Sequence, residues 1–327
     1  MFDNQRPGVY SRVELSGQMA GDGSCAALLL PSQGGQEVSA RVESYHDGLS
    51  LLAGNNLALD CLRLLFGGSG EVIVVVAPGF AQALEALGGF GEVRAIVSGF
   101  AETQDLAALR SFAESSAQGQ RECVVFAGID APQAAISAAQ SLNSGRVVLC
   151  CPAISLEEEE EAHPIYGACA LAAAVVGASS PIRNFNGETF PALHHAPLMP
   201  EDAVQSLLKA GVSVFENVGA RVELIRALTT NGGNLRSLNT VLIIDYVMRS
   251  VRQSLRVKLS AGRATIEGVR DLVAVELASK RDAGIITTFA PPRCRPDKND
   301  PGICVVEISF GVAHLLSKIH LTAHIRV

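Results

Sequence analysis

Residues 71–98 read EVIVVVAPGFAQALEALGGFGEVRAIVS, and the alternation within them indicates the fold class. An apolar run at 72–76 is followed by apolar residues at helical spacing over 80–87, and a second apolar run lies at 93–97. Short apolar runs that alternate with helices are typical of βαβ units, in which parallel strands are buried on both faces. The stretch therefore predicts two parallel strands joined by a crossover helix.

The same alternation continues downstream and extends the predicted sheet. Apolar strand-like runs lie at 123–126 and 147–150, and helical patterns lie at 103–116, 132–142 and 166–176. Strands and helices in this order build a buried parallel sheet between helical layers. The sequence thus predicts an α/β fold with a parallel-sheet core domain.

Four segments are expected along the 327 residues. Residues 1–20 form an N-terminal arm. Residues 21–200 form the α/β core, within which 21–70 is a Gly-rich, poorly defined β-rich part. Residues 201–317 form an α+β domain, with strands at 212–215, 221–227 and 303–312 and helices at 201–208, 238–255 and 266–281. Residues 318–327 form a C-terminal strand arm.

Both ends of the chain carry the pattern of a strand with one apolar face. Apolar and polar residues alternate strictly over 318–327, and nearly so over 8–15. A strand of this kind pairs either within its own subunit or with the sheet of a neighbour, and the pattern leaves both open. The strand at 303–312 is the expected acceptor. The residues expected in intersubunit strands are Val9, Tyr10, Val13, Leu15, Val306, Ile308, Phe310, Ile319, Leu321, Ala323, Ile325 and Val327.

Composition restricts the class of protein. The chain is 48% hydrophobic and 18% charged, as in core-forming globular proteins, and no apolar run reaches the roughly 18 residues of a membrane span. Its start lacks the features of a signal peptide, which predicts synthesis in the cytosol. None of the eight cysteines forms a CxxC pair. Cys294 and Cys304 flank a Pro-rich loop, which leaves a cross-link open as an alternative, but cytosolic thiols are normally reduced.

Charge is distributed unevenly. The net charge is −7, yet residues 221–281 carry 11 basic and five acidic residues. An acidic chain is a poor nucleic-acid binder, whereas a local basic face suits an acidic protein surface. In the helix at 238–255, Arg249, Arg252 and Arg256 share one face, separate from a buried stripe of Val241, Ile244, Val247, Val251 and Leu255. Two interpretations remain for these arginines: a solvated face, or a surface for an acidic partner.

The motifs of catalysis do not occur where the fold would need them. In a dinucleotide-binding fold the glycines follow the first strand, but here Gly67, Gly68 and Gly70 precede the strand at 72–76. There is no GxxxxGK[ST] and no GxSxG motif. His163, the pair at 194–195 and the pair at 320 and 324 have no evident partners, and the run 157–161 is expected to be a solvated loop. We therefore predict no catalytic residue, cofactor or metal.

Four stretches carry a resemblance to a known family. They are Arg6-Pro7-Gly8-Val9-Tyr10; LLKAGVSVFE at 207–216; Leu228-Thr229-Thr230, which leads through 238–239 into IDYVMR at 244–249; and KIHLTAHI at 318–325. In order and placement they resemble the tail sheath proteins of contractile phages and contractile bacteriocins. Residues 21–70 match poorly, and the chain is short for that family.

The resemblance implies a structural subunit without enzymatic activity. Such subunits stack as six-fold rings into a helical tube around an inner tail tube, exchange terminal strands with their neighbours and contract to drive the tube through a cell envelope. The implied partners are the chain itself, the tube protein, and the baseplate and tail terminator proteins. Nucleic acid is not bound, and a membrane is met only as the target of the tube. The implied location is a virion tail or bacteriocin particle, assembled in the host bacterial cytoplasm. The arginine face would then meet the tube. An α/β enzyme with an unrecognised site and a small-ligand or nucleic-acid-binding module remain as alternatives.

Overall fold

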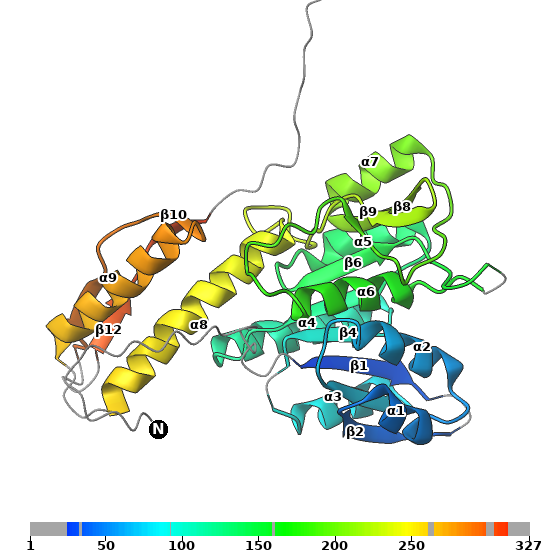
Figure 1. Cartoon of the computed structure of the whole chain (residues 1–327), viewed down its shortest axis with the longest axis horizontal. Helices are drawn as coiled ribbons and strands as arrows, with labels where there is room; N and C mark the ends of the chain where they lie inside the picture. The colour runs from blue at the N-terminus through cyan, green and yellow to red at the C-terminus, as the bar shows by residue number, and fades with distance from the viewer. Residues whose placement is uncertain are drawn as a thin grey trace, which may run out of the picture.

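The computed structural model describes residues 25–32, 35–91, 93–158, 161–260, 265–298 and 304–312, with the side chains of 258–260 left out. These residues form two parts, a sheet-based core domain and a smaller unit at the far end of a long helix (Figure 1). The predicted arms at 1–20 and 318–327 lie outside the described residues.

The core domain is built on a mixed sheet. Its described strands lie in the order β2-β3-β1-β4-β5-β6-β8-β9-β7. The strands from β3 to β8 in that order are mutually parallel, while β2 pairs antiparallel with β3, and β9 pairs antiparallel with both β8 and β7. The bounds are β1 Ala26–Pro31, β2 Val38–Val42, β3 Val72–Ala77, β4 Ala95–Ser98, β5 Val124–Gly128, β6 Val147–Cys151, β7 Glu188–Thr189, β8 Val212–Val218 and β9 Arg221–Leu224.

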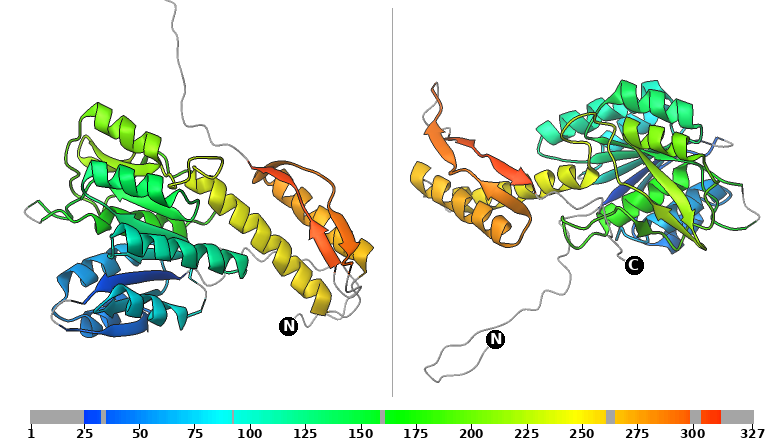
Figure 2. Two further views of the ribbon diagram at one scale, coloured as in Figure 1. Left: turned by 180° about the vertical axis from the view of Figure 1, so that it is seen from behind. Right: turned by 90° about the horizontal axis from the view of Figure 1, so that it is seen from above.

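Helices cover both faces of the sheet, as the view in the right panel of Figure 2 shows. Successive residues of β1 point to opposite sides, so that Leu28 lies in one hydrophobic core and Leu29 in the other. This two-sided burial explains why the strands are continuous apolar runs. One face carries α1 (Tyr45–Leu51), α2 (Asn56–Leu65) and α6 (Ile165–Val176); the other carries α3 (Phe80–Gly88), α4 (Thr103–Gln118), α5 (Pro132–Leu142) and α7 (Glu201–Ala210).

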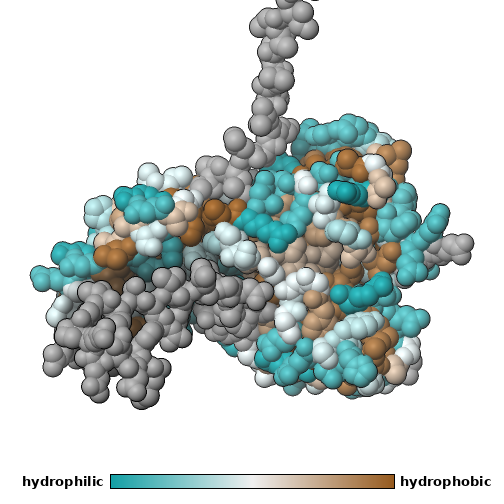
Figure 3. All heavy atoms as spheres, viewed as in Figure 1, coloured by the Kyte–Doolittle hydropathy of each residue, from teal (hydrophilic) through white to brown (hydrophobic). Residues whose placement is uncertain are grey.

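The second part begins with helix α8 (Leu238–Ser260), which starts within the core domain and leads away from it (Figures 1 and 2). Its first turns bury Leu238 and Val241 in a core shared with the sheet. Further along, Val247 and Val251 belong to a third, separate core, together with residues of α9 (Ile266–Asp282). On the face seen in Figure 3, hydrophilic and hydrophobic residues are interspersed over both parts.

The predicted α/β class is confirmed, with three differences in detail. Residues 21–70 hold the strands β1 and β2 but also two helices, α1 and α2, which were not predicted. A boundary after residue 200 was expected, but α7, β8 and β9 lie in the core domain, since β8 pairs with β6 and continues the sheet. The strand expected at 303–312 is divided into β12 (Cys304–Glu307) and β13 (Phe310–Val312).

Candidate functional site: a ribbon with unpaired edges and the joint of helix α8

The second part carries a twisted pair of strands at its outer side. The segments β10 (Ile286–Phe289) and β11 (Arg293–Pro296) run antiparallel to β13 and β12. Among the described residues these pairs are two-stranded sheets, so each strand has one paired and one unpaired edge. We call residues 286–296 and 304–312 the ribbon. An unpaired strand edge is a template for a further strand.

The ribbon is stabilised by the helices beneath it. A two-stranded hairpin is marginally stable by itself in water, and packing against a helix supplies the missing burial. Ile286 is buried against α8 and α9, and Phe289 of β10 packs against the same core. The two helices are held together by Glu276, which accepts hydrogen bonds from Ser250 and Ser254 and forms an ion pair with Lys280 at 3.0 Å. Figure 2 (left) shows the strands lying along this helix pair, away from the core sheet.

The residues predicted for intersubunit strands fall into two groups. Val306, Ile308 and Phe310 lie on the ribbon, half-buried against the third core. The other nine lie outside the described residues: Val9, Tyr10, Val13, Leu15, Ile319, Leu321, Ala323, Ile325 and Val327. Their pairing stays a prediction.

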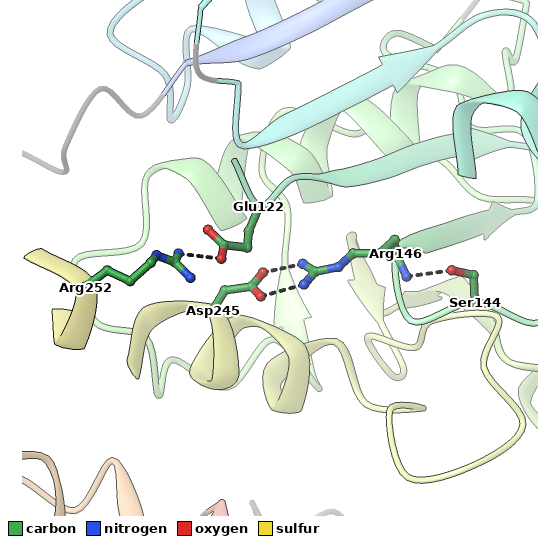
Figure 4. A network of polar contacts seen from close by, with 5 residues as sticks. All are labelled: Glu122, Ser144, Arg146, Asp245 and Arg252. Carbon is green, nitrogen blue, oxygen red and sulfur yellow. Dashed lines mark hydrogen bonds and ion pairs between the residues drawn. The ribbon is translucent and has the colours of Figure 1, made fainter. Parts of the chain in front are cut away.

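The joint between α8 and the core domain is formed by two ion pairs (Figure 4). Arg146, at the start of β6, makes two hydrogen bonds to the carboxylate of Asp245 on α8, one of them 2.7 Å long. Arg252, two turns further along α8, pairs with Glu122 at the start of β5. The backbone of Arg146 is itself fixed, because its N–H donates to Ser144 Oγ over 3.1 Å. These contacts attach α8 to the core domain at two points, Asp245 and Arg252.

The burial of these ion pairs makes them important for stability. The side chains of Asp245 and Glu122 are 7% and 6% exposed, and those of Arg146 and Arg252 are 18% and 20% exposed. Burial raises the pKa of Asp245, while the hydrogen bonds and charge of Arg146 act in the opposite direction. Removing one member of a buried pair is strongly destabilising, because the other charge is left without compensation.

The three arginines predicted to face a tube have different surroundings. Arg252 is engaged with Glu122, and Arg256 Nη2 donates to Gln120 Oε1 at 3.2 Å. Both therefore contact the core domain of their own chain, but Arg252 is half-buried whereas Arg256 is exposed. Arg249 lies nearby and lines a cavity of about 420 Å³ between α8 and the amino-terminal ends of β4 and β5. A role of this face toward a tube stays a prediction.

The cavity has walls of both charge signs. Arg94, Arg249 and Lys280 line it together with Glu122 and Asp245, and Phe185 and Leu242 add apolar surface. The Oε2 atom of Glu122 is buried and has no hydrogen-bond partner among the described residues. A phosphate site would instead concentrate positive charge and backbone N–H groups.

An open α/β sheet usually binds ligands at the carboxyl ends of its strands, and the end of β5 is closely packed. A Cβ added to Gly128, at the end of β5, would lie 1.8 Å from the carbonyl oxygen of Pro164. Backbone therefore covers this end of β5. Among the described residues no group of three or more His, Cys, Asp and Glu side chains is placed to hold a metal, and no described helix has the length and apolarity of a membrane span.

Of the histidines singled out in the sequence, His163 and His195 have partners in a loop, and His320 and His324 lie outside the described residues. His163 and His195 form isolated β-bridges with Ile154 and Ser155. The Nδ1 atom of His195 lies 2.9 Å from Asn217 Nδ2, and that of His163 accepts a hydrogen bond from the N–H of Ile165. These contacts give both side chains structural partners.

Comparison with known proteins shows which fold the chain shares. No protein-family model matches the chain. An alignment of 165 residues, 46% of the chain, is 30% identical to the tail sheath protein of Bacillus phage SP01, and it covers 29% of that protein. Among solved structures, a chain of the helical sheath of the anti-feeding prophage in its contracted state matches with a TM-score of 0.72 and 14% identity, over 98% of this chain and 99% of that one. The chain has the fold of a contractile tail sheath protein.

A second sheath structure agrees. The sheath tail protein of Listeria innocua matches with a TM-score of 0.69 and 11% identity, over 90% of this chain and 96% of that chain. The resemblance drawn from the four sequence stretches is therefore confirmed for the fold. The structural matches extend over nearly the whole of both chains, so the matched region takes in the residues of the ribbon and of α8. The chain spans less than a third of the length of its curated phage relative.

Proposed function

We propose that the chain is the structural subunit of a contractile tail sheath. In this function it polymerises as stacked six-fold rings around an inner tail tube and contracts to drive the tube through a cell envelope. The observation that carries the proposal is the likeness, over nearly the full length of both chains, to a subunit of a contracted helical sheath. The ribbon edges that are unpaired among the described residues support it, because a polymer joined by strands needs an acceptor.

The proposed joints are the terminal arms. Residues 8–15 and 318–327 of neighbouring subunits add strands to the ribbon of a third. Each backbone hydrogen bond so formed contributes roughly 0.5–1.5 kcal/mol net, and several form for each strand. A head-to-tail contact whose rotation does not close generates a helical filament. An edge that would otherwise promote aggregation thereby becomes the contact between rings.

The remaining parts of the proposal follow from the same family. The partners are other copies of the chain, the tube protein, the baseplate and the terminator. The particle is a phage tail or a bacteriocin, assembled in the cytoplasm of the host. Contraction uses conformational energy stored during assembly. We therefore expect it to proceed in a purified particle without added nucleotide.

Electron microscopy of negatively stained protein tests the assembly. The purified chain is expected to form striated hollow tubes, and a chain lacking residues 318–327 is expected to stay a folded, soluble monomer. A matched pair of substitutions sharpens the test: Leu321→Lys places a charge on the apolar face of the arm, whereas Thr322→Lys changes the polar face. Tubes should be lost only with Leu321→Lys. Tubes formed by the truncated chain would contradict the proposed role of this arm, and a small closed oligomer of the intact chain would contradict a sheath function.

A further inference from the structure

The two strands β11 and β12 bring together a pair of cysteines that the proposed function does not use. In the antiparallel register Cys294 lies opposite Val306, and Cys304 lies opposite Pro296. Residues two positions apart on a strand share a face, so both thiols project from the same face of the ribbon as diagonal neighbours. Val306, on that face, packs against the third core, which places the pair on the side of α8 and α9.

The pair differs from the other cysteines in its exposure. Cys294 and Cys304 are partly exposed, whereas the remaining six are buried: Cys25, Cys61, Cys123, Cys150, Cys151 and Cys169. A buried thiol is shielded from oxidants, and burial raises the pKa of Cys150 and Cys151 far from the range in which thiolate forms. Thiol oxidation of the folded chain is therefore directed to this one pair.

The register brings the two cysteines near the range of an internal cross-link. Diagonal positions on an antiparallel pair are roughly 7–8 Å apart at Cα, and a disulfide spans about 4.4–6.8 Å, so the bond requires β11 and β12 to move closer together at this point. Cys304 is near enough to raise the pKa of Cys294. Burial and this neighbour raise the pKa of Cys294, and Arg270 of α9 lowers it in part. Closure is thus expected to be slow at neutral pH and faster as the pH rises.

We propose that Cys294 and Cys304 form an intramolecular disulfide that fastens β11 to β12 when the protein meets a low-molecular-weight disulfide. The Cys294 thiol loses its proton, and the thiolate attacks one sulfur of the oxidant, which releases one reduced thiol and leaves a mixed disulfide. The thiolate of Cys304 then attacks the Cys294 sulfur and releases the second reduced thiol. Two protein thiols are oxidised, one small disulfide is reduced, and both protons end on the released thiols.

The cross-link would strengthen the ribbon without closing it. It lies on the face of the ribbon, so the unpaired edges stay available, while β11 and β12 can no longer separate. That the fastened ribbon serves as a strand acceptor rests on the proposed function; the formation of the bond does not. A particle assembled in a reducing cytosol and released outside the cell would acquire the bond after assembly.

Peptide mapping tests the bond directly. The full chain is purified under reducing conditions, oxidised with glutathione disulfide, alkylated and digested with trypsin. Cleavage after Lys298 separates the two cysteines, so the disulfide is seen as one linked peptide pair that falls apart on reduction, in a chain that has lost two hydrogens. Two separate glutathione adducts, or a link between chains only, would overturn the proposal.

A control variant with the thiol on the opposite face of β12 distinguishes the effect of thiol position from the general reactivity of the thiols toward glutathione. Cys304→Ser combined with Val305→Cys moves the thiol to the opposite face of β12, next to the position of Arg295. This variant should take up glutathione at its cysteines and give no linked pair. A linked pair as abundant as in the natural chain would refute the geometric argument. Tube formation by reduced and oxidised protein is recorded in parallel: failure of both samples to form tubes counts against the sheath function and leaves the disulfide result standing.

Discussion

Asp245→Ala should loosen the attachment of α8 to the core domain. The substitution leaves the Arg146 guanidinium, 18% exposed, without the carboxylate that compensates it. Loss of one partner from a buried pair costs about 3–5 kcal/mol. Burial raises the pKa of Asp245, which means that burying this carboxylate is itself unfavourable, and its removal returns part of the loss. We therefore expect about 3 kcal/mol, a large share of the roughly 5–15 kcal/mol that stabilises a typical protein.

The reverse substitution should behave differently with pH. Arg146→Met leaves Asp245 buried without its cation, and the carboxyl group can relieve this by taking up a proton. A carboxyl whose pKa is higher in the folded than in the unfolded chain binds more protons in the folded state. The stability of Arg146→Met should accordingly decrease as the pH rises through the interval between the unfolded value and the raised folded value. Asp245→Ala has no carboxyl at this position and should lack that dependence.

Two controls define the measurement, which is urea unfolding followed by circular dichroism. Arg146→Met combined with Asp245→Leu removes both charges and should recover most of the loss, because no charge is left alone. Arg295→Ala breaks the exposed pair with Glu307, whose side chains are 54% and 53% exposed, and should cost at most about 1 kcal/mol. If Asp245→Ala costs no more than Arg295→Ala, the joint does not hold α8 and the reasoning is refuted.

Three further results are expected. Arg249→Glu should prevent assembly of sheath around a tube while sparing tube-free polymerisation, as seen by electron microscopy. Normal extended particles of this variant would show that Arg249 points elsewhere. Arg252→Glu is unsuitable for the test because its new carboxylate would face Glu122. Burial lowers the pKa of His163 against an opposing effect of Glu161, so stability should fall as the pH decreases through the ordinary histidine range, and His163→Gln should flatten this dependence in urea titrations. Gly128→Ala should lower the melting temperature by an overpacking cost of about 1–3 kcal/mol, since its Cβ would collide with the Pro164 carbonyl; an unchanged melting temperature would contradict that contact.

The local sequence pattern was sufficient to predict the strands of the core sheet, but it did not reveal the two N-terminal helices. A run such as Val72–Ala77 is apolar throughout because both faces of β3 are covered, and sequence periodicity reports such burial directly. Helices α1 and α2 were missed among the glycines of 21–70, although both have a recognisable start. The side chain of Ser44 accepts from the N–H of Asp47, and that of Asn55 accepts from the N–H of Ala58. N-cap residues of this kind were the available signal.

The joint could not be found from the sequence by any local rule. Arg146 and Asp245 are 99 residues apart, and Glu122 and Arg252 are 130 residues apart. Helical spacing placed Arg249, Arg252 and Arg256 on one face, and it carries no information on what that face meets. Glu122, directly before a buried apolar strand, was the one indication that a cation would approach. A charge at this position requires a partner, but the sequence does not say which.

The arrangement of joint and ribbon has a mechanical consequence for a sheath. Helix α8 has 23 residues and so spans roughly 35 Å. It is tied to the core domain through Asp245 and Arg252, and from Ile243 onward it packs in the core that also holds α9 and the ribbon. A neighbouring strand bound to the ribbon would pull on the core domain through this one helix. Ion pairs with defined hydrogen-bond geometry favour discrete positions over continuous sliding. We therefore expect weakening of the joint to uncouple strand binding at the ribbon from movement of the core.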